Sequence, residues 1–369
     1  MCDAMAVGAL ISDPHPGVEV PDGSEHELLL VRRGMRTGIQ MIVAVHSTVL
    51  GPALGGCRMW HYATLRDAID DALRLSSAMT LKAAAARLPL GGGKSVVRLP
   101  DGPQPSGALR RAMLQDFADA LNLLDGLYIT AEDVGSTPED MAVLSSHSSF
   151  VVGSPARRGG SGDPGDFTAA GVQAAMKACC ARRYGTAKLA GRSVAIVGLG
   201  HVGEPLARRL VKDGASLLLS DIDPARLTLA NELGASWLDP EDALRAEVDV
   251  LAPCALGGVL DDVLAEELGC QIVCGSANNQ LARDEVADRL AARGIMYAPD
   301  FIVNSGGLIN VSLELTGYDR ALAQRRADEI EGVLEQVLLH AEQTSVTPLA
   351  AAVELANGRL AAAERSTAA

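Results

Sequence analysis

Two lysines and the glycines between them are the residues of this 369-residue chain whose types and spacing most directly suggest chemistry. Lys82 lies in an alanine-rich stretch, which favours a helix. Lys94 follows three consecutive glycines and precedes an apolar run that is typical of a strand. We predict that Pro89 and the glycines end the helix and form a tight loop. Such a loop places both ammonium groups at one pocket, which a small ligand can approach closely because glycine has no side chain.

The sequence Gly93-Lys94-Ser95 also occurs in phosphate loops that bind nucleoside triphosphates. That motif requires a glycine at position 88, where this chain has Leu88. The nucleotide-phosphate interpretation is therefore rejected. The remaining alternative, that both lysines are ordinary surface charges, describes most lysines in proteins.

Two adjacent carboxylates, Glu132 and Asp133, end a short apolar stretch that begins at Leu127. Acidic residues in this position are often simple turn formers. They can also serve as a base when a cation and a substrate lie nearby. The residues alone leave both interpretations open.

The strongest local signal is a strand, a glycine-rich turn and a helix in direct succession. Residues 193–197 form a buried-type strand, followed by Gly198-Leu-Gly200-His-Val-Gly203 and the helical stretch 204–213. A second strand, 216–220, ends at Asp221. This order is the dinucleotide fingerprint, in which the glycines allow a tight turn, close approach of a pyrophosphate and close helix packing. The alternative is a glycine turn that binds nothing.

The carboxylate of Asp221 favours NAD over NADP. An acid at the end of the second strand can bind both ribose hydroxyls and repels a 2′-phosphate. No arginine follows until Arg226. We expect His201 to be exposed beside the phosphates rather than catalytic. The sequence therefore predicts NAD as the cofactor.

The surrounding pattern predicts two α/β domains with a cleft between them. Residues 1–150, completed by 346–369, are predicted to bind substrate and form subunit contacts, and residues 151–345 to bind NAD. Residues 1–24 are expected to be a loose arm, 153–166 a linker, and Thr168 the N-cap of a helix that runs to Arg183. The other expected elements are strands at 27–31, 38–46, 248–252, 271–275 and 294–297, a loop at 51–58, and helices at 64–88, 108–124, 319–343 and 347–364.

Net charge, cysteine spacing and the distribution of apolar residues limit the kinds of partner and compartment that we expect for this chain. A net charge of −14 argues against nucleic acid or an anionic membrane as the main partner. The seven cysteines include no C-x-x-C pair, so we predict no metal site. The sequence shows neither a signal-peptide pattern nor an apolar run of about 20 residues, so a reducing cytoplasm is expected.

Taken together, the motifs resemble the dehydrogenases of glutamate, leucine, phenylalanine and valine, from about residue 25 to residue 350. The matching motifs are Gly51-Pro-Ala-Leu-Gly-Gly56, Met79-Thr-Leu-Lys82, Leu90-Gly-Gly-Gly-Lys94, Thr130-Ala-Glu-Asp133-Val, Gly198-Leu-Gly-His-Val-Gly203, Ala252-Pro-Cys-Ala-Leu256, Ser276-Ala-Asn-Asn279 and Ala298-Pro-Asp-Phe301. Their number and order make the resemblance specific.

The resemblance implies a role for each site residue. Lys82 would bind the substrate α-carboxylate with help from Asn279, Lys94 would be the catalytic lysine, and Asp133 the general acid and base. The chemistry needs these types, because loss of hydride from Cα leaves an imine that water attacks with a base nearby. The other implied substrate contacts are Gly55, Gly56, Leu54, Ala131, Leu308 and Val311. The implied cofactor contacts are Gly198, Gly200, His201, Val202, Gly203, Asp221, Thr168, Ala255 and Asn278.

The predicted reaction is the reversible NAD-dependent oxidative deamination of an L-amino acid by a homo-oligomer of two to eight subunits. The aliphatic pocket positions favour leucine or valine over glutamate, whereas the segment 158–162 is similar to the phenylalanine enzymes and keeps phenylalanine as an alternative. A non-catalytic NAD-binding sensor is the alternative from another class. A 2-hydroxy acid dehydrogenase is not favoured, because no histidine is placed for that chemistry.

Overall fold

The computed structural model describes residues 25–367, so the expected loose arm at residues 1–24 lies outside the described part. The described chain forms two compact units. The first contains residues 25–163, Glu314–Tyr318 and residues 359–367; the second contains Pro164–Leu313 and Asp319–Gly358. The functional roles assigned to the two domains from the sequence stay a prediction.

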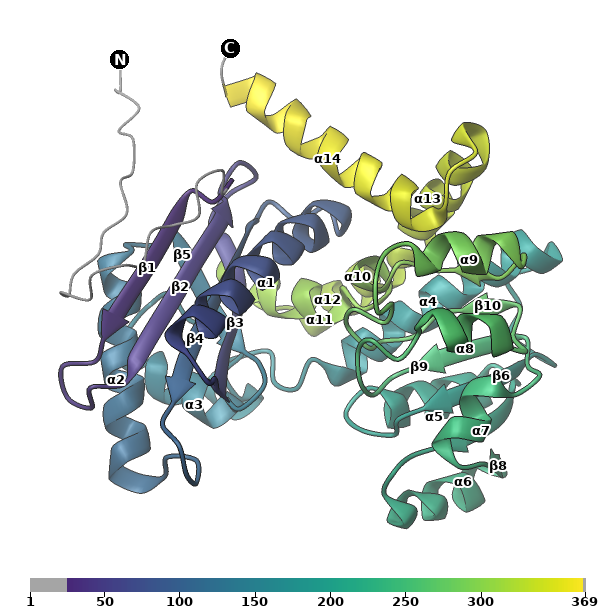
Figure 1. The fold of residues 1–369 in the computed structure, drawn as a ribbon, viewed down its shortest axis with the longest axis horizontal. Coiled ribbons are helices and arrows are strands. Elements are labelled where there is room, and N and C mark those ends of the chain that lie inside the picture. The colour runs from purple at the N-terminus through teal and green to yellow at the C-terminus, as the bar shows by residue number, and fades with distance from the viewer. Residues whose placement is uncertain (1–24, 368–369) are drawn as a thin grey trace. The chain divides into compact units, whose positions relative to one another are not determined.

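The first unit is built on a sheet that carries the N-terminal strands (Figure 1). The sheet has five strands in the order β1-β2-β4-β3-β5. Its strands are β1 (Leu28–Arg33), β2 (Gln40–Ser47), β3 (Ala53–His61), β4 (Gly91–Leu99) and β5 (Tyr128–Glu132). β2 runs antiparallel to both of its neighbours, whereas β3 is parallel to β4 and β5. The predicted strands at 27–31 and 38–46 correspond to β1 and β2.

Helices cover both faces of this sheet. The strand β2 alternates, as a half-buried strand must: Ile42 and Ala44 pack with α1 (Leu65–Ala85), whereas Met41 and Val43 pack with α2 (Gly107–Leu123) on the other face. The short helix α3 (Pro138–Leu144) joins α2 there. Thr64 begins α1 with a capping box, in which its side chain accepts from the backbone N–H of Asp67.

The glycine loop predicted between the two lysines is wrong. Gly91, Gly92 and Gly93 are residues of β4, and none of the three has a positive φ. They are glycines because neighbours crowd them: a Cβ on Gly92 would lie 2.1 Å from the backbone nitrogen of Thr80 in α1, and one on Gly93 would lie 2.6 Å from the ring of Tyr128. The helix therefore packs directly against the glycine strand.

The loop predicted at residues 51–58 is also wrong, because β3 begins at Ala53. Gly55 and Gly56 misled the prediction, since glycine usually weakens a strand. Here they lie in β3, which is paired with β4 on one side and with β5 on the other. A Cβ on Gly55 would lie 1.8 Å from the carbonyl oxygen of Gly93, so the strand tolerates no side chain at that point.

The second unit contains a parallel sheet of six strands with the order β11-β10-β9-β6-β7-β8. The strands are β6 (Ser193–Val197), β7 (Ser216–Ser220), β8 (Ser236–Trp237), β9 (Val250–Pro253), β10 (Ile272–Val273) and β11 (Met296–Tyr297). Numbered along the unit, the order reads 6-5-4-1-2-3, the arrangement of dinucleotide-binding sheets. The predicted strand–turn–helix–strand unit is present, with α5 (Gly203–Lys212) joining β6 to β7.

The remaining α-helices of the described chain lie wholly or partly in this unit. They are α4 (Gly165–Tyr184), α6 (Leu227–Leu233), α7 (Pro240–Arg245), α8 (Asp262–Glu267), α9 (Val286–Ala292), α10 (Asp300–Val303), α11 (Gly306–Ser312), α12 (Arg320–Asp328), α13 (Ile330–Thr344) and α14 (Pro348–Thr367). Between residues 25 and 367, none is long and apolar enough to cross a membrane.

Two predictions about these helices are wrong. Thr168 is not an N-cap, because α4 begins three residues earlier; the Thr168 hydroxyl instead donates to the carbonyl of Pro164 at 3.0 Å. The helix expected at 319–343 is two helices, α12 and α13, which meet at Glu329. The helix expected at 347–364 corresponds to α14, and Thr347 in front of it accepts a hydrogen bond from the N–H of Ala350.

Late segments of the chain complete the first unit. Arg359 of α14 donates to the carbonyl of Ala84 at 2.8 Å, at the end of α1. The carboxylate of Glu314 accepts hydrogen bonds from the backbone N–H groups of Gly153 and Ser161 in the predicted linker. Both contacts join residues of the first unit that are more than 150 positions apart in sequence.

Candidate active site

The predicted catalytic pair, Lys94 and Asp133, meets on the sheet of the first unit. Lys94 Nζ donates to Asp133 Oδ2 at 2.7 Å. The two side chains come from opposite sides of β3, since Lys94 belongs to β4 and Asp133 directly follows β5. Gly56 leaves the space between them: a Cβ there would lie 2.6 Å from the Cβ of Asp133. The ion pair therefore requires glycine at position 56.

Strand alternation determines which predicted substrate residues share this face. Gly56 pairs with Ala131 of β5, and Leu54 pairs with Gly92 of β4. Partners in adjacent strands face the same side, and residues two apart do so as well. Leu54, Gly56, Lys94 and Ala131 therefore lie on the face that α1 covers, and α1 also carries Lys82. The same alternation places Gly55 on the other face.

A tight turn holds Asp133 in place. Its backbone N–H donates to Ser136 Oγ at 2.9 Å, and the same hydroxyl donates to the carbonyl of Cys57 in β3. Gly135 in this turn has a φ of 82° and lies so close to Met59 that a Cβ would be 2.0 Å from the Met59 carbonyl oxygen. The carboxylate is thus presented from a backbone anchored to β3.

The electrostatic environment keeps Asp133 ionised. Burial opposes the charge, but the ammonium of Lys94 and the guanidinium of Arg58 outweigh burial and lower the pKa of the Asp133 carboxyl. Burial raises the pKa of the neighbouring Cys57 thiol to about 12, so that thiol stays neutral. The site can therefore hold a carboxylate that accepts a proton beside a buried lysine that donates hydrogen bonds.

Arg58 is a site residue that sequence reasoning missed. Its Nε donates to Asp133 Oδ2 at 3.1 Å. The available signal was the spacing of Leu54, Gly56 and Arg58, which places all three on one face once the segment is recognised as a strand. The prediction of a loop at 51–58 concealed it.

The glycine turn of the second unit fits a dinucleotide. Gly198 has a φ of 104°, as a tight turn needs, and a Cβ on Gly203 would lie 1.8 Å from the Gly198 carbonyl oxygen. By contrast, a Cβ on Gly200 would meet nothing within 4 Å. The fold therefore explains two of the glycines, and the open space at the exposed Gly200 suits a pyrophosphate lying against the backbone at the start of α5.

Asp221 lies beside this turn. Its Oδ2 accepts from the N–H of Leu199 at 2.6 Å, and its Oδ1 accepts from the N–H of Asp223 at 2.8 Å. The carboxylate thereby links the end of β7 to the glycine turn. An acidic group in this position can accept hydrogen bonds from a ribose.

Comparison with known proteins places the chain in a family. The description "Glu/Leu/Phe/Val dehydrogenase, dimerisation domain" matches residues 29–149, and "Glutamate/Leucine/Phenylalanine/Valine dehydrogenase" matches residues 219–367. The chain belongs to this dehydrogenase family. The match confirms the resemblance stated from the motifs and the two-sheet α/β fold.

Individual relatives agree with this family. The leucine dehydrogenase of Thermoactinomyces intermedius is 42% identical over 315 residues, which are 85% of this chain and 84% of that protein. The phenylalanine dehydrogenase of Caldalkalibacillus thermarum is 38% identical and covers 91% of this chain and 92% of its own. The crystal structure of L-tryptophan dehydrogenase from Nostoc punctiforme has a TM-score of 0.81 at 34% identity, covering 92% of this chain and 97% of that one.

The chain is therefore an amino-acid dehydrogenase, an oxidoreductase of a family that uses pyridine nucleotides. The alternative of a non-catalytic sensor is not supported, because the relatives are named as enzymes. The roles of the individual site residues, the choice between NAD and NADP and the identity of the amino acid stay predictions.

The remaining predicted residues of this dehydrogenase lie in its second unit. Ala255 abuts the glycine turn, since a Cβ on Gly198 would lie 2.7 Å from its methyl group. Asn278 Oδ1 accepts from the buried side-chain amide of Asn304 at 2.8 Å, and the next residue, Asn279, has a left-handed backbone with a φ of 51°. Such backbone conformations are uncommon outside glycine and cluster at functional sites.

Five other predicted residues lie in or just before the helices of this unit. Thr168 lies in the first turn of α4, and its hydroxyl would be 2.8 Å from a Cβ on Gly307. Leu308 and Val311 are buried residues of α11, three positions apart and so on one side of the helix. His201 is exposed, and Val202 immediately precedes α5.

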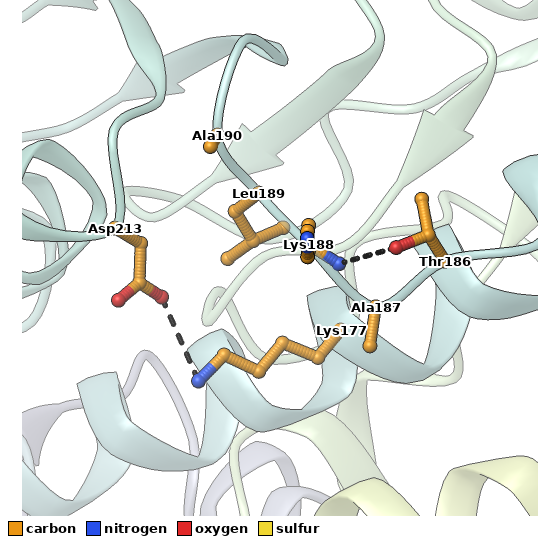
Figure 2. A pocket seen from close by; sticks show the side chains of 7 residues that line it. All are labelled: Lys177, Thr186, Ala187, Lys188, Leu189, Ala190 and Asp213. Atoms are coloured by element: carbon orange, nitrogen blue, oxygen red, sulfur yellow. Dashed lines mark hydrogen bonds and ion pairs between the residues drawn. The ribbon is translucent and has the colours of Figure 1, made fainter.

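A separate hollow of about 470 Å³ lies in the same unit (Figure 2). It is lined by Lys177, Thr186, Ala187, Lys188, Leu189, Ala190 and Asp213. The ammonium of Lys177 points toward the Asp213 carboxylate at 3.6 Å. This hollow adjoins the loop that precedes β6, whereas the glycine turn follows β6, and none of the predicted site residues lines it.

Proposed function

We propose that this dehydrogenase catalyses the reversible NAD-dependent oxidative deamination of an L-amino acid with an apolar side chain to a 2-oxo acid and ammonia. The observation that carries the proposal is the 2.7 Å contact between Lys94 Nζ and Asp133 Oδ2. The Lys94 side chain is only 7% exposed, and the Asp133 side chain 23%. A buried ion pair contributes little to the stability of a protein. A lysine paired with a carboxylate of lowered pKa is therefore better explained by a role in acid–base catalysis.

Each residue has one task in the proposed reaction. Lys82 binds the substrate α-carboxylate, helped by the side-chain amide of Asn279. The ionised Asp133 accepts a proton from the substrate ammonium, releases it to solvent, and then accepts a proton from the attacking water. Lys94 donates a hydrogen bond to the oxygen on which negative charge develops. Asp133 then returns a proton to the departing amino group.

The nicotinamide cofactor, when bound, accepts the hydride from Cα. We infer that the cofactor is NAD, because the Asp221 carboxylate beside the glycine turn would repel a 2′-phosphate. Together with water, the amino acid and the oxidised cofactor yield the 2-oxo acid, ammonium, the reduced cofactor and one proton.

Leucine is the favoured substrate. The predicted side-chain contacts, Leu54, Ala131, Leu308 and Val311, are all aliphatic and offer no cation for a γ-carboxylate. Leucine dehydrogenases are among the relatives at 40% identity and above. L-phenylalanine is the alternative, supported by the segment 158–162 and by a relative at 38% identity.

The test is NAD reduction by the purified protein at alkaline pH with L-leucine, L-valine, L-phenylalanine and L-glutamate offered separately. We expect the highest kcat/KM with L-leucine and none with L-glutamate. Lys94→Ala should abolish turnover while NADH binding, measured by fluorescence, is retained. Substantial turnover by that variant would remove Lys94 from the mechanism, and no turnover of any substrate by the wild type would refute the proposed reaction.

We further propose that the enzyme is a homo-oligomer in the cytoplasm. The matched N-terminal family description names a dimerisation domain, and one related structure is titled a hetero-hexameric glutamate dehydrogenase from Thermus thermophilus. Multi-angle light scattering would check this, and a 38.3 kDa particle would contradict it.

A further inference from the structure

A line of alternating charges extends from the predicted catalytic pair. Lys94 contacts Asp133, and Asp133 contacts Arg58 Nε at 3.1 Å. Arg58 Nη1 donates to Asp71 Oδ2 of α1 at 2.9 Å. The same oxygen of Asp71 accepts from the hydroxyl of Tyr62 at 2.6 Å. Asp133 is therefore one member of a network that ties β4, the turn after β5, β3 and α1 together.

Only one oxygen of Asp133 is held by this network. Lys94 and Arg58 both donate to Oδ2, and among the described residues Oδ1 receives no hydrogen bond. Two donors on one carboxylate oxygen fix the plane of the group and leave the other oxygen available. An available oxygen of fixed orientation is what a base needs in order to accept a proton from water or an ammonium.

Arg58 is suited to hold the carboxylate, because its guanidinium is planar and offers donors in a fixed fork. Its two contacts are with carboxylates on different elements, so its position is set by Asp71 as well as by Asp133. The Arg58 side chain is 23% exposed and that of Asp71 is 16% exposed. The pair is therefore less screened by solvent than an ordinary surface ion pair.

Asp71, which holds Arg58, lies on the same helix as Lys82, the lysine predicted to bind the substrate carboxylate. Asp71 and Lys82 are both residues of α1, eleven positions apart. Eleven residues make about three turns of an α-helix, so the two side chains leave the helix on the same side. Arg58 thus connects the predicted base to the same side of α1 from which Lys82 extends.

We propose that Arg58 is a positioning residue of this dehydrogenase: it orients the Asp133 carboxylate through Oδ2, keeps it ionised and leaves Oδ1 to exchange protons with the substrate. This inference rests on the proposed function and deepens it. The charged or titratable groups that face Asp133 are Lys94 from β4, and Arg58 and the neutral Cys57 thiol from β3. Arg58 and Lys94 are the cations among these groups, and Arg58 does not take part in the bond changes.

The test compares Arg58→Gln and Arg58→Lys with the wild type and with Arg192→Gln. Arg192 is a matched control because it also pairs with an aspartate, Asp249, and its side chain is similarly exposed at 25%, but it lies immediately before β6 in the second unit. The measurements are the pH profile of kcat/KM for L-leucine, the NADH affinity and the urea midpoint.

For Arg58→Gln we expect the acid limb of the profile to move to higher pH, because Asp133 loses a cation that favours its charge. Activity near neutral pH should fall about tenfold or more and recover in part at alkaline pH. Arg58→Lys keeps the charge but not the fork, so the limb should stay near its wild-type position while kcat falls. NADH affinity should be unchanged in both, and Arg192→Gln should leave the profile as it is.

An Arg58→Gln variant with lower activity but an unmoved acid limb would overturn the proposal, and so would full activity. A double-mutant cycle of Arg58→Gln with Asp133→Asn gives a readout that does not depend on turnover. Unfolding in urea should show favourable coupling at pH 7 that is lost as the pH falls and Asp133 is protonated; absence of coupling at pH 7 would refute the contact. Coupling without wild-type turnover of any amino acid would instead refute the proposed reaction and leave the ion pair standing.

Discussion

Gly200 offers a test of the cofactor site that separates binding from folding. A Cβ at Gly200 would meet nothing within 4 Å, and its φ is not in the left-handed region. Gly200→Ala should therefore cost the fold nothing, and it can stabilise by up to about 1 kcal/mol because alanine restricts the unfolded chain. If the cofactor pyrophosphate lies against this backbone, the same methyl group occupies its place.

The expected loss follows from the contact that is displaced. A hydrogen bond from a backbone N–H to a charged oxygen contributes about 1.5–3 kcal/mol, which corresponds to roughly a 10- to 150-fold weaker Kd. Titration calorimetry with NADH measures the affinity, and thermal unfolding without NADH measures the fold. Gly332→Ala is the matched control, because Gly332 of α13 also has open space around it; this variant should gain about 1 kcal/mol of stability and bind NADH normally.

Unchanged NADH affinity in a folded Gly200→Ala protein would refute the reasoning, because the pyrophosphate could not then lie over this residue. A large loss of thermal stability would contradict the open space described around Gly200. Gly203→Ala should behave differently, since its Cβ would lie 1.8 Å from the Gly198 carbonyl oxygen and would disturb both folding and binding.

Three further changes test other parts of the molecule. Asp221→Ser should weaken NAD binding and lower the preference for NAD over NADP about tenfold or more, because a negative charge is removed; an unchanged ratio of kcat/KM values would defeat that assignment. Leu54→Gly should raise kcat/KM for L-phenylalanine relative to L-leucine, because Leu54 is fully buried on the α1 face; a constant ratio in a folded variant would remove Leu54 from the pocket. Asp116→Asn should lower stability by about 2 kcal/mol at pH 7, because a buried carboxylate that accepts from Arg36 and Thr37 loses its charge. Burial opposes the Asp116 charge, but these hydrogen bonds lower its pKa, so the contribution is present above about pH 4 and is lost as the pH falls; urea midpoints that differ equally at pH 7 and pH 3 would contradict this.

The sequence predictions that succeeded depended on residues that are close to one another in the sequence. The fingerprint at residues 198–203 was recognisable because its glycines act within one strand–turn–helix unit. Thr64 and Thr347 were placed correctly near helix starts for the same reason, since capping depends on residues a few positions away. The family resemblance rested on the same short motifs.

The predictions that failed depended on distant neighbours. Gly91 to Gly93 look like a loop in sequence, but they are strand residues crowded by Thr80 and by the ring of Tyr128. The contact of Arg58 with Asp133 spans 75 positions, so the spacing of Leu54, Gly56 and Arg58 indicates a shared face of the strand but not the partner of Arg58. The single helix expected after residue 319 is interrupted at Glu329, and neither glycine nor proline occurs within two residues of that break.

The closure of the first unit by late residues has a consequence for synthesis. The end of α1, the helix that carries Lys82, is capped by Arg359, and Glu314 secures residues 153 and 161. A ribosome therefore makes all of Pro164–Leu313 before the first unit can be completed. Domains usually fold in order as the chain emerges from the ribosome. Here the first unit cannot form all of its contacts until most of the second unit has been synthesised. A fragment ending at residue 163 would lack both contacts and should be a poor substitute for the intact first unit.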